Sequence, residues 1–65
     1  MYDTQKIRLL MLEKQLTQQE LAEKAGLNPG TVSRVLITGN AKIKTIFKIA
    51  QALNVDITEL IRKEV

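Results

Sequence analysis

Apolar residues recur every three or four positions in five stretches of the chain, the spacing of an amphipathic α-helix. With 65 residues the chain has the length of one small domain. The pattern therefore predicts an all-α fold in a single domain over residues 1–65, built from five short helices. We expect these helices at about 3–14, 18–25, 29–38, 42–53 and 57–64.

Polar and special residues mark where these helices begin and end. Asp3 or Thr4 is expected to cap the first helix, and the run Thr17–Glu20 has the form of a capping box. Gly26 suits the left-handed position that ends a helix. Asn28 is a favourable N-cap and Pro29 a favourable first helical residue. One helix thus stops and the next starts within a few residues, which is typical of a helix-turn-helix.

The same periodicity predicts which side chains face the core. The expected core residues are Ile7, Leu10, Met11, Leu21, Ala22, Ala25, Val32, Val35, Leu36, Ile43, Ile46, Phe47, Ala50, Leu53, Ile57, Leu60 and Ile61, with Leu9, Leu12 and Leu16 widening the first stripe.

The opposite face of the helix at 29–38 is small and polar around one arginine. Gly30, Arg34 and Ile37 point away from the core at about 100° per residue. They are flanked by Thr31, Ser33 and Thr38. Small residues permit close approach to a surface, and the arginine fork matches the major-groove edge of guanine. An exposed helix with an unused arginine would look the same, so this face alone leaves both interpretations open.

Charge favours a polyanionic partner. The net charge is +3, and residues 24–55 contain five basic residues and no acid. A solvated lysine-bearing face is the structural alternative. Lys42 and Lys44 begin a helix without a good preceding cap, where the helix dipole disfavours positive charge. Backbone amides and two lysines at this place would suit a phosphate group.

Composition argues against several other functions. The chain has no histidine and no cysteine, so thiol and imidazole catalysis and the usual zinc ligands are absent. We expect no enzyme, no metal site and no cofactor. Tyr2 and Phe47 are the only aromatic residues, too few for a platform that stacks single-stranded bases. The absence of cysteine, of a signal pattern and of a long apolar run predicts a cytoplasmic location.

The run LTQQELAEKAGLNPGTVSRV resembles the helix-turn-helix of Cro- and phage-repressor-type regulators, the XRE family. The resemblance continues through Gly39, TIFKIAQALNV and DITEL. It implies a compact five-helix, lambda-repressor-like fold that places the helix at about 28–38 in the DNA major groove. It also implies that Gln18 contacts a phosphate, that Pro29, Gly30 and Arg34 face the bases, and that the loop from Thr38 to Lys42 contacts the DNA backbone.

We therefore expect a sequence-specific, double-stranded-DNA-binding transcriptional regulator, and a repressor in outcome. Base readout is assigned to Pro29, Gly30, Ser33 and Arg34, and backbone contact to Gln18, Asn28, Thr31, Thr38, Asn40, Lys42 and Lys44. The expected partner is a two-fold operator bound by a homodimer, with Ile61 or Val65 at the dimer surface. The alternatives are an antitoxin-type regulator that also binds a protein, and a helical protein-interaction module without DNA binding.

Overall fold

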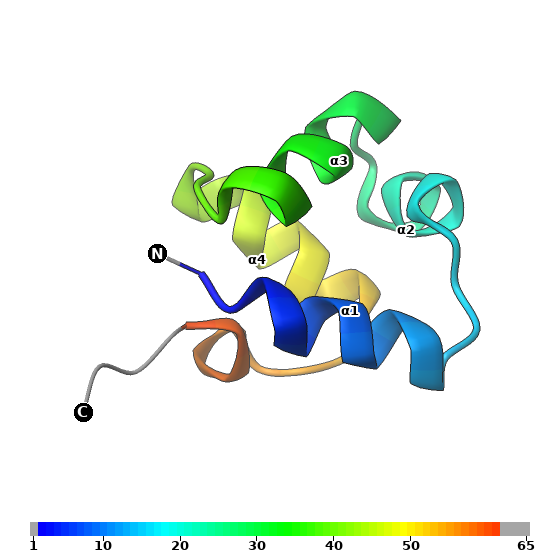
Figure 1. Ribbon diagram of the computed structural model, residues 1–65, viewed down its shortest axis with the longest axis horizontal. Helices are drawn as coiled ribbons and strands as arrows, with labels where there is room; N and C mark the ends of the chain where they lie inside the picture. The colour runs from blue at the N-terminus through cyan, green and yellow to red at the C-terminus, as the bar shows by residue number, and fades with distance from the viewer. Residues whose placement is uncertain (1, 62–65) are drawn as a thin grey trace.

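Four α-helices and one short 3₁₀ helix make up the computed structural model, in which residues 2–61 are described (Figure 1). The elements are α1 (Thr4–Glu13), α2 (Gln18–Ala25), α3 (Pro29–Thr38), α4 (Ile43–Ala52) and the 3₁₀ helix η1 (Ile57–Leu60). The all-α prediction is confirmed, and each of the four α-helices begins and ends within one residue of its predicted bounds. No helix in the described part of the chain is long and apolar enough to cross a membrane.

The predicted fifth α-helix over 57–64 is wrong for the residues that the structure describes. Only a single 3₁₀ turn forms, and Ile61 is extended, with φ −89° and ψ 123°. An antiparallel bridge joins Ile61 to Tyr2, and the amide of Asp3 donates to the carbonyl of Leu60 at 2.8 Å. The N-terminal segment thus occupies the Leu60 carbonyl, which a continuing α-helix would need as an acceptor for its own backbone hydrogen bonds. Residues 62–64, and Val65 with them, lie outside the described residues.

The predicted end signals of α1 and α2 are confirmed. Asp3 caps α1 by accepting from the amide of Lys6 at 3.0 Å. In the capping box, the Glu20 amide donates to the Thr17 hydroxyl at 3.1 Å, and the Thr17 amide donates to the Glu20 carboxylate at 3.0 Å. These bonds from Thr17 lower the pKa of Glu20 from its ordinary 4.5. The carboxylate form of Glu20 therefore stabilises the fold at pH values above its ordinary pKa of 4.5, and this stabilisation is lost as the pH falls through the lowered pKa of the folded protein.

The turn between α2 and α3 is built as the sequence predicts. Gly26 is left-handed, with φ 69° and ψ 33°, and the Leu27 amide donates to the carbonyl of Ala22 at 2.8 Å. Asn28 then caps α3, its side-chain oxygen accepting from the Gly30 amide at 2.8 Å, and Pro29 is the first helical residue. The end of α2 and the start of α3 are thus both capped by residues of the turn itself, and the two helices pack against each other.

Gly26→Val is expected to lower the free energy of unfolding by about 1–2 kcal/mol. A Cβ added at Gly26 would meet nothing within 4 Å, so the cost is the left-handed backbone alone, which a β-branched residue resists. Urea denaturation of the two proteins measures it. Gly26→Asn is the control and should lose less, because asparagine tolerates this conformation. Equal losses in the two variants, or none in Gly26→Val, would contradict this explanation.

The core lies where α1, α2, α3, α4 and η1 converge. Its buried members are Ile7, Leu10, Met11, Leu21, Ala22, Val32, Val35, Leu36, Ile46, Ile49, Ala50, Leu53 and Leu60. Ile49 is fully buried although the sequence pattern did not place it in the core. It completes the inner stripe of α4 beside Ile46 and Ala50.

Several residues predicted to face inward are exposed instead. The exposed fractions are 60% for Ile43, 50% for Phe47, 50% for Leu9, 74% for Leu12 and 43% for Ile61. On α1, Leu9 and Leu12 lie across the helix from Ile7, which faces the core, and the other helices leave them largely exposed. On α4 the apolar side is wider than the strip that its neighbours cover. Ile57 is half-buried against the core.

Candidate nucleic-acid interface

Helix α3 presents a free face that is small in side-chain volume. Its inner side is held by the buried residues Val32, Val35 and Leu36. Pro29, Gly30 and Arg34 are exposed and Ser33 is half-buried, so all four residues predicted to read bases lie on the accessible side of one helix. Ile37 is 76% exposed on the same side. With glycine and proline in its first turn, this helix can approach another surface closely.

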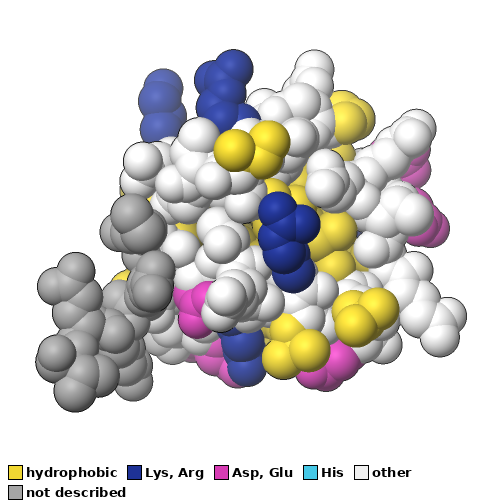
Figure 2. Space-filling view, viewed as in Figure 1, with side chains coloured by type: hydrophobic (Ala, Val, Ile, Leu, Met, Phe, Trp, Pro, Cys, Tyr) yellow, Lys and Arg dark blue, Asp and Glu magenta, His cyan; other side chains and the backbone are white. Residues whose placement is uncertain are grey.

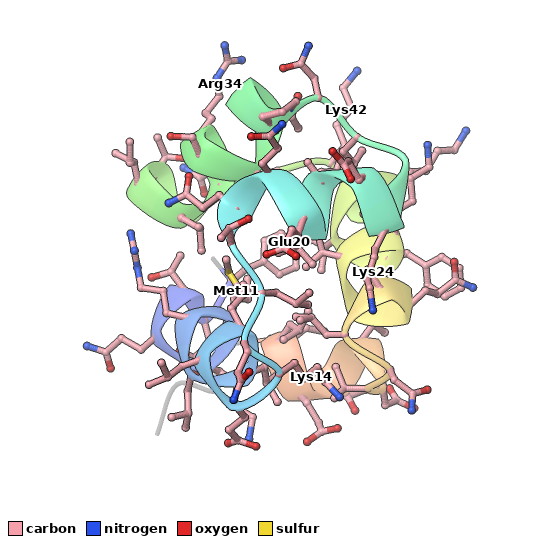
Figure 3. All side chains as sticks on the ribbon, turned by 90° about the vertical axis from the view of Figure 1, so that its right-hand side faces the viewer. Met11, Lys14, Glu20, Lys24, Arg34 and Lys42 are labelled. Atoms are coloured by element: carbon pink, nitrogen blue, oxygen red, sulfur yellow. The ribbon has the colours of Figure 1, made fainter. Side chains whose placement is uncertain are left out.

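A hollow with basic side chains at its rim lies along one flank of α3. It is lined by Thr31, Arg34, Val35, Asn40, Ala41, Lys42 and Thr45. It thus brings together four predicted site residues from α3, the α3–α4 loop and the start of α4. Arg34 and Lys42 project from the same end of the molecule (Figure 3). Such a cluster offers both charge and neutral donors to an anionic group.

A second hollow lies along the opposite flank of α3. Leu36, which lines it, lies on the other side of the helix from Thr31, which lines the first hollow. The second hollow is lined by Arg8, Met11, Leu12, Leu16, Gln18 and Leu36. Gln18 is the first residue of α2. Arg8 crosses from α1 and donates through Nη2 to the carbonyl of Leu36 at 3.3 Å. This flank also carries hydrogen-bond donors, a side-chain amide and a guanidinium.

Two residues that were predicted to contact the DNA backbone, Asn28 and Thr38, make hydrogen bonds within the protein. The Thr38 hydroxyl donates to the Arg34 carbonyl at 2.9 Å and accepts from the Asn40 amide at 3.2 Å. The Asn28 oxygen is engaged by its cap, which leaves its amide group to donate outward. Thr38 therefore shapes the end of α3 and the loop after it, next to the left-handed Gly39 (φ 71°).

The start of α4 is as unusual in the structure as in the sequence. Lys42 occupies the N-cap position with no side-chain hydrogen bond to the helix, and no acid lies in the first turn. The Thr45 amide already donates to the Lys42 carbonyl at 2.9 Å, so the amides of Ile43 and Lys44, which precede it, are the ones available to an external anion. Lys44 is not in the hollow of Arg34 and Lys42, and lines a separate one on α4 with Phe47. The structure thus separates the two lysines that the sequence grouped.

Basic side chains without acidic neighbours project from one edge of the molecule. Lys and Arg side chains stand at the upper edge, over α3 and the loop that follows, and others lie in the middle and at the lower edge of this face, whereas Asp and Glu lie along the lower and right-hand edges (Figure 2). An extended polyanion would be attracted to the α3 end.

Two residues of this surface were missed by sequence reasoning. Arg8 reaches α3 across 28 positions, and Thr45 enters the hollow from the first turn of α4. Arg8 carries a visible signal, its charge on the first helix, but nothing local connects it to Leu36. Thr45 carries no signal that distinguishes it from any helical threonine.

The geometry suits the major groove of a DNA duplex. A helix fits that groove, which is about 12 Å wide and bordered by both phosphate strands. A helix that lies there needs a close-packing outer face and donors on both flanks. Here α3 supplies the face, the hollow of Arg34 and Lys42 one flank, and the hollow of Gln18 and Arg8 the other.

Comparison with known proteins agrees with this geometry. A helix-turn-helix family model matches residues 7–60, most of the chain and all of the surface just described. No curated protein and no solved structure gave a match. The matched segment contains the capping box, the turn at Gly26 and the α3 face, the same features on which the resemblance rests. The chain therefore belongs to the XRE-type helix-turn-helix family of DNA-binding domains.

Proposed function

We propose that this protein is a sequence-specific regulator of transcription that lays α3 in the major groove of double-stranded DNA. The observation that supports this most is the placement of donors on both flanks of an exposed, small-residue helix. Phosphate contacts on the two flanks fix register, and base edges met by the helix supply sequence information. We propose repression as the outcome, because a domain docked in the groove occludes the DNA that it covers.

Each side chain of the interface has a distinct part in this proposal. Arg34 reads a guanine through its bidentate fork, while Pro29, Gly30 and Ser33 bring the helix close enough for that contact. Backbone contact falls to Gln18, Asn28, Thr31, Asn40, Lys42 and Lys44, with Thr38 holding the loop in shape. Arg8 joins this set through its place beside Gln18.

The operator is proposed to be two-fold and bound by a homodimer. One copy offers a single arginine to the bases, and a second copy doubles the readout, with half-sites about 34 Å apart. Ile61 is 43% exposed and accessible for such a contact. Selection of bound duplexes from a randomised pool, with the mass of the complex measured, tests the proposal. Inverted repeats with two chains per duplex are expected. Sites without any sequence preference would overturn it.

Lys42→Ala is expected to weaken binding to every duplex by a similar factor. The slope of the log of the binding constant against the log of salt concentration should become shallower by about 1 for each phosphate that the variant no longer neutralises. The reason is that Lys42 is exposed at an uncapped helix start, where it can meet a phosphate but carries no base-reading fork. Titrations at two salt concentrations, on the selected duplex and a scrambled one, measure the effect.

Lys14→Ala is the matched control for this titration. Lys14 is the C-cap residue of α1, and its side chain lines neither hollow beside α3. Other residues of α1 line only the hollow on the Gln18 flank. Removal of Lys14 changes the net charge equally and should leave the salt dependence close to that of the wild type. Equal changes in the two variants would mean that Lys42 acts only through net charge.

A second function, the binding of a protein partner in addition to DNA, is favoured by one observation. Ile43 and Phe47 were expected in the core, and both lie exposed on α4.

A further inference from the structure

Helix α4 has an apolar margin that no other described element covers. Its core stripe is formed by Ile46, Ile49 and Ala50. Ile43 and Phe47 lie about 60–100° around the helix from Ile46, one turn apart, and remain 60% and 50% exposed. Single exposed apolar residues are ordinary, but this pair lines one hollow together with Lys44, Lys48 and Gln51.

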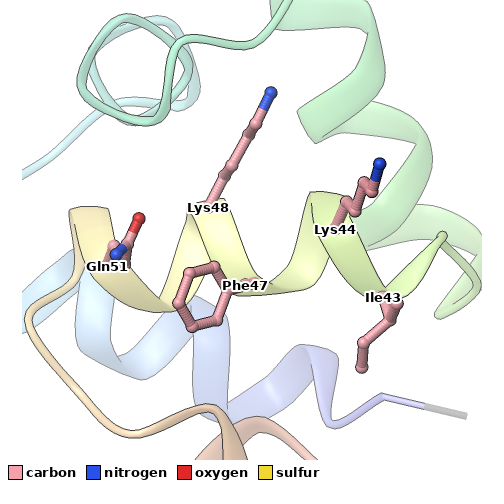
Figure 4. A pocket seen from close by; sticks show the side chains of 5 residues that line it. All are labelled: Ile43, Lys44, Phe47, Lys48 and Gln51. Carbon is pink, nitrogen blue, oxygen red and sulfur yellow. The ribbon is translucent and has the colours of Figure 1, made fainter.

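Lys44 and Lys48 give the hollow a positive charge. Figure 4 shows Lys44 and Lys48 rising side by side from α4, with the ring of Phe47 and the side chain of Ile43 on the adjoining side of the helix. No acid occurs anywhere in residues 24–55, so neither α4 nor the elements just before it supply a counter-charge. A ligand that covers Phe47 would therefore bring carboxylates to Lys44 and Lys48.

The composition of this margin resembles the centre and rim of a protein interface. An aromatic and a branched aliphatic side chain form the centre, and charged residues border it on one side. The anchors are spaced i and i+4, so a second helix laid along α4 meets both with one apolar stripe. The α4 margin is defined here as Ile43, Lys44, Phe47, Lys48 and Gln51.

Other occupants fit the margin less well. A second copy packed by two-fold symmetry on the same margin would set the lysines of one chain beside those of the other. A membrane surface would be met by two apolar side chains on a helix of 10 residues, far less apolar area than interfacial helices bury. Single-stranded nucleic acid would find one aromatic ring and no platform.

We propose that the α4 margin docks an acidic amphipathic helix of a partner protein. Leucine, isoleucine or phenylalanine side chains of that helix pack on Phe47 and Ile43, and its aspartates or glutamates pair with Lys44 and Lys48. Lys44 also belongs to the proposed DNA contacts, so a bound partner competes with phosphate for it and weakens DNA binding. The docking itself does not depend on the proposed function.

A displayed library of random helical peptides, selected on the wild-type protein alone, tests the proposal. Recovered peptides are expected to combine acidic residues with apolar residues at i and i+3 or i+4. Phe47→Ala should weaken their binding about tenfold or more, as for an interface anchor. Lys48→Glu should weaken it and remove its salt dependence, because the charge pairing is reversed. Leu9→Ala is the matched control, an apolar residue on α1 that is 50% exposed like Phe47 and lines neither hollow beside α3, and should change nothing.

Thermal unfolding and binding to the selected duplex are measured on the same variants. Phe47→Ala is expected to keep both, since its ring is half exposed and outside the proposed DNA contacts. The proposal is overturned if recovered peptides do not depend on Phe47 or carry no acidic bias. It is also overturned if Phe47→Ala instead abolishes self-association of the protein, or its binding to vesicles containing anionic phospholipid. A protein that binds these peptides but no duplex would sink the proposed function and leave the docking standing.

Discussion

Leu60→Ala is expected to lower the free energy of unfolding by about 2–5 kcal/mol. Leu60 is fully buried although it belongs to a single 3₁₀ turn near the end of the described chain. Its side chain packs into the core shared by α1 and α4, so truncation leaves a cavity that rigid helices cannot fill. A domain of this size has a total stability of only a few to about 10 kcal/mol. The variant should therefore be partly unfolded at 37 °C in urea-free buffer.

Urea denaturation followed by circular dichroism measures this loss, with two controls. Ile61→Ala removes a similar volume from a side chain that is 43% exposed, and should cost less than about 1 kcal/mol. Leu60→Met nearly conserves volume and should cost less than about 1.5 kcal/mol. If Leu60→Ala and Ile61→Ala lose the same amount, the 3₁₀ turn does not close the core.

The start and end of each α-helix could be predicted because their signals are local. Thr17 and Glu20 satisfy each other's amides across three residues, and Asn28 reaches only two residues ahead. Gly26 needs no partner at all to take its left-handed conformation. Such features depend on the backbone near them, which the sequence specifies directly.

The end of the chain could not be predicted in the same way. Asp56 caps this segment by accepting from the Thr58 amide at 2.9 Å, but the helix after it stops at Leu60. What stops it is Tyr2 and Asp3, which pair with this segment from the other end of the described chain. A competition between a local helix and a distant backbone partner leaves no trace in local periodicity.

Which side chains face the core was predictable for α3 and only in part for α4. Both have a clear apolar stripe, but the number of neighbours decides how wide a strip is covered. Helix α3 packs on α1 and α2, and its outward face matches the pattern. On α4 the covered strip stops at Ile46 and Ala50, which leaves Phe47 outside it. The sequence therefore predicts the outward face of α3 but not the exposed α4 margin.

The two flanks of the candidate interface depend on tertiary structure as well. Periodicity predicts that Arg34 points outward, but not that Lys42 and Thr45 share its hollow. It also gives no reason to place Arg8 beside Gln18, since the contact of Arg8 with Leu36 follows from how α1 packs on α3. The residue types of the interface were predictable, and their grouping required the fold.

Arg34→Ala is expected to weaken binding to the selected duplex by about 1–3 kcal/mol and to relax preference at one base pair in each half-site. Arg34 is exposed in the middle of α3, between the two flanks that would hold the phosphate strands. Its fork can reach O6 and N7 of one guanine, and no other cation lies on α3. Loss of the fork removes base discrimination, while loss of its charge removes only a small, sequence-independent part of the affinity.

Arg34→Lys separates those two contributions. Lysine keeps the charge and loses the planar pair of donors, so binding to a scrambled duplex should stay near that of the wild type while preference for the selected duplex falls. Replacing the contacted guanine with 7-deazaguanine removes the N7 acceptor and should weaken the wild type but not Arg34→Ala. Both titrations are run at the same salt concentration. If Arg34→Ala loses affinity equally on the selected and the scrambled duplex, Arg34 is a solvated charge and α3 reads sequence without it.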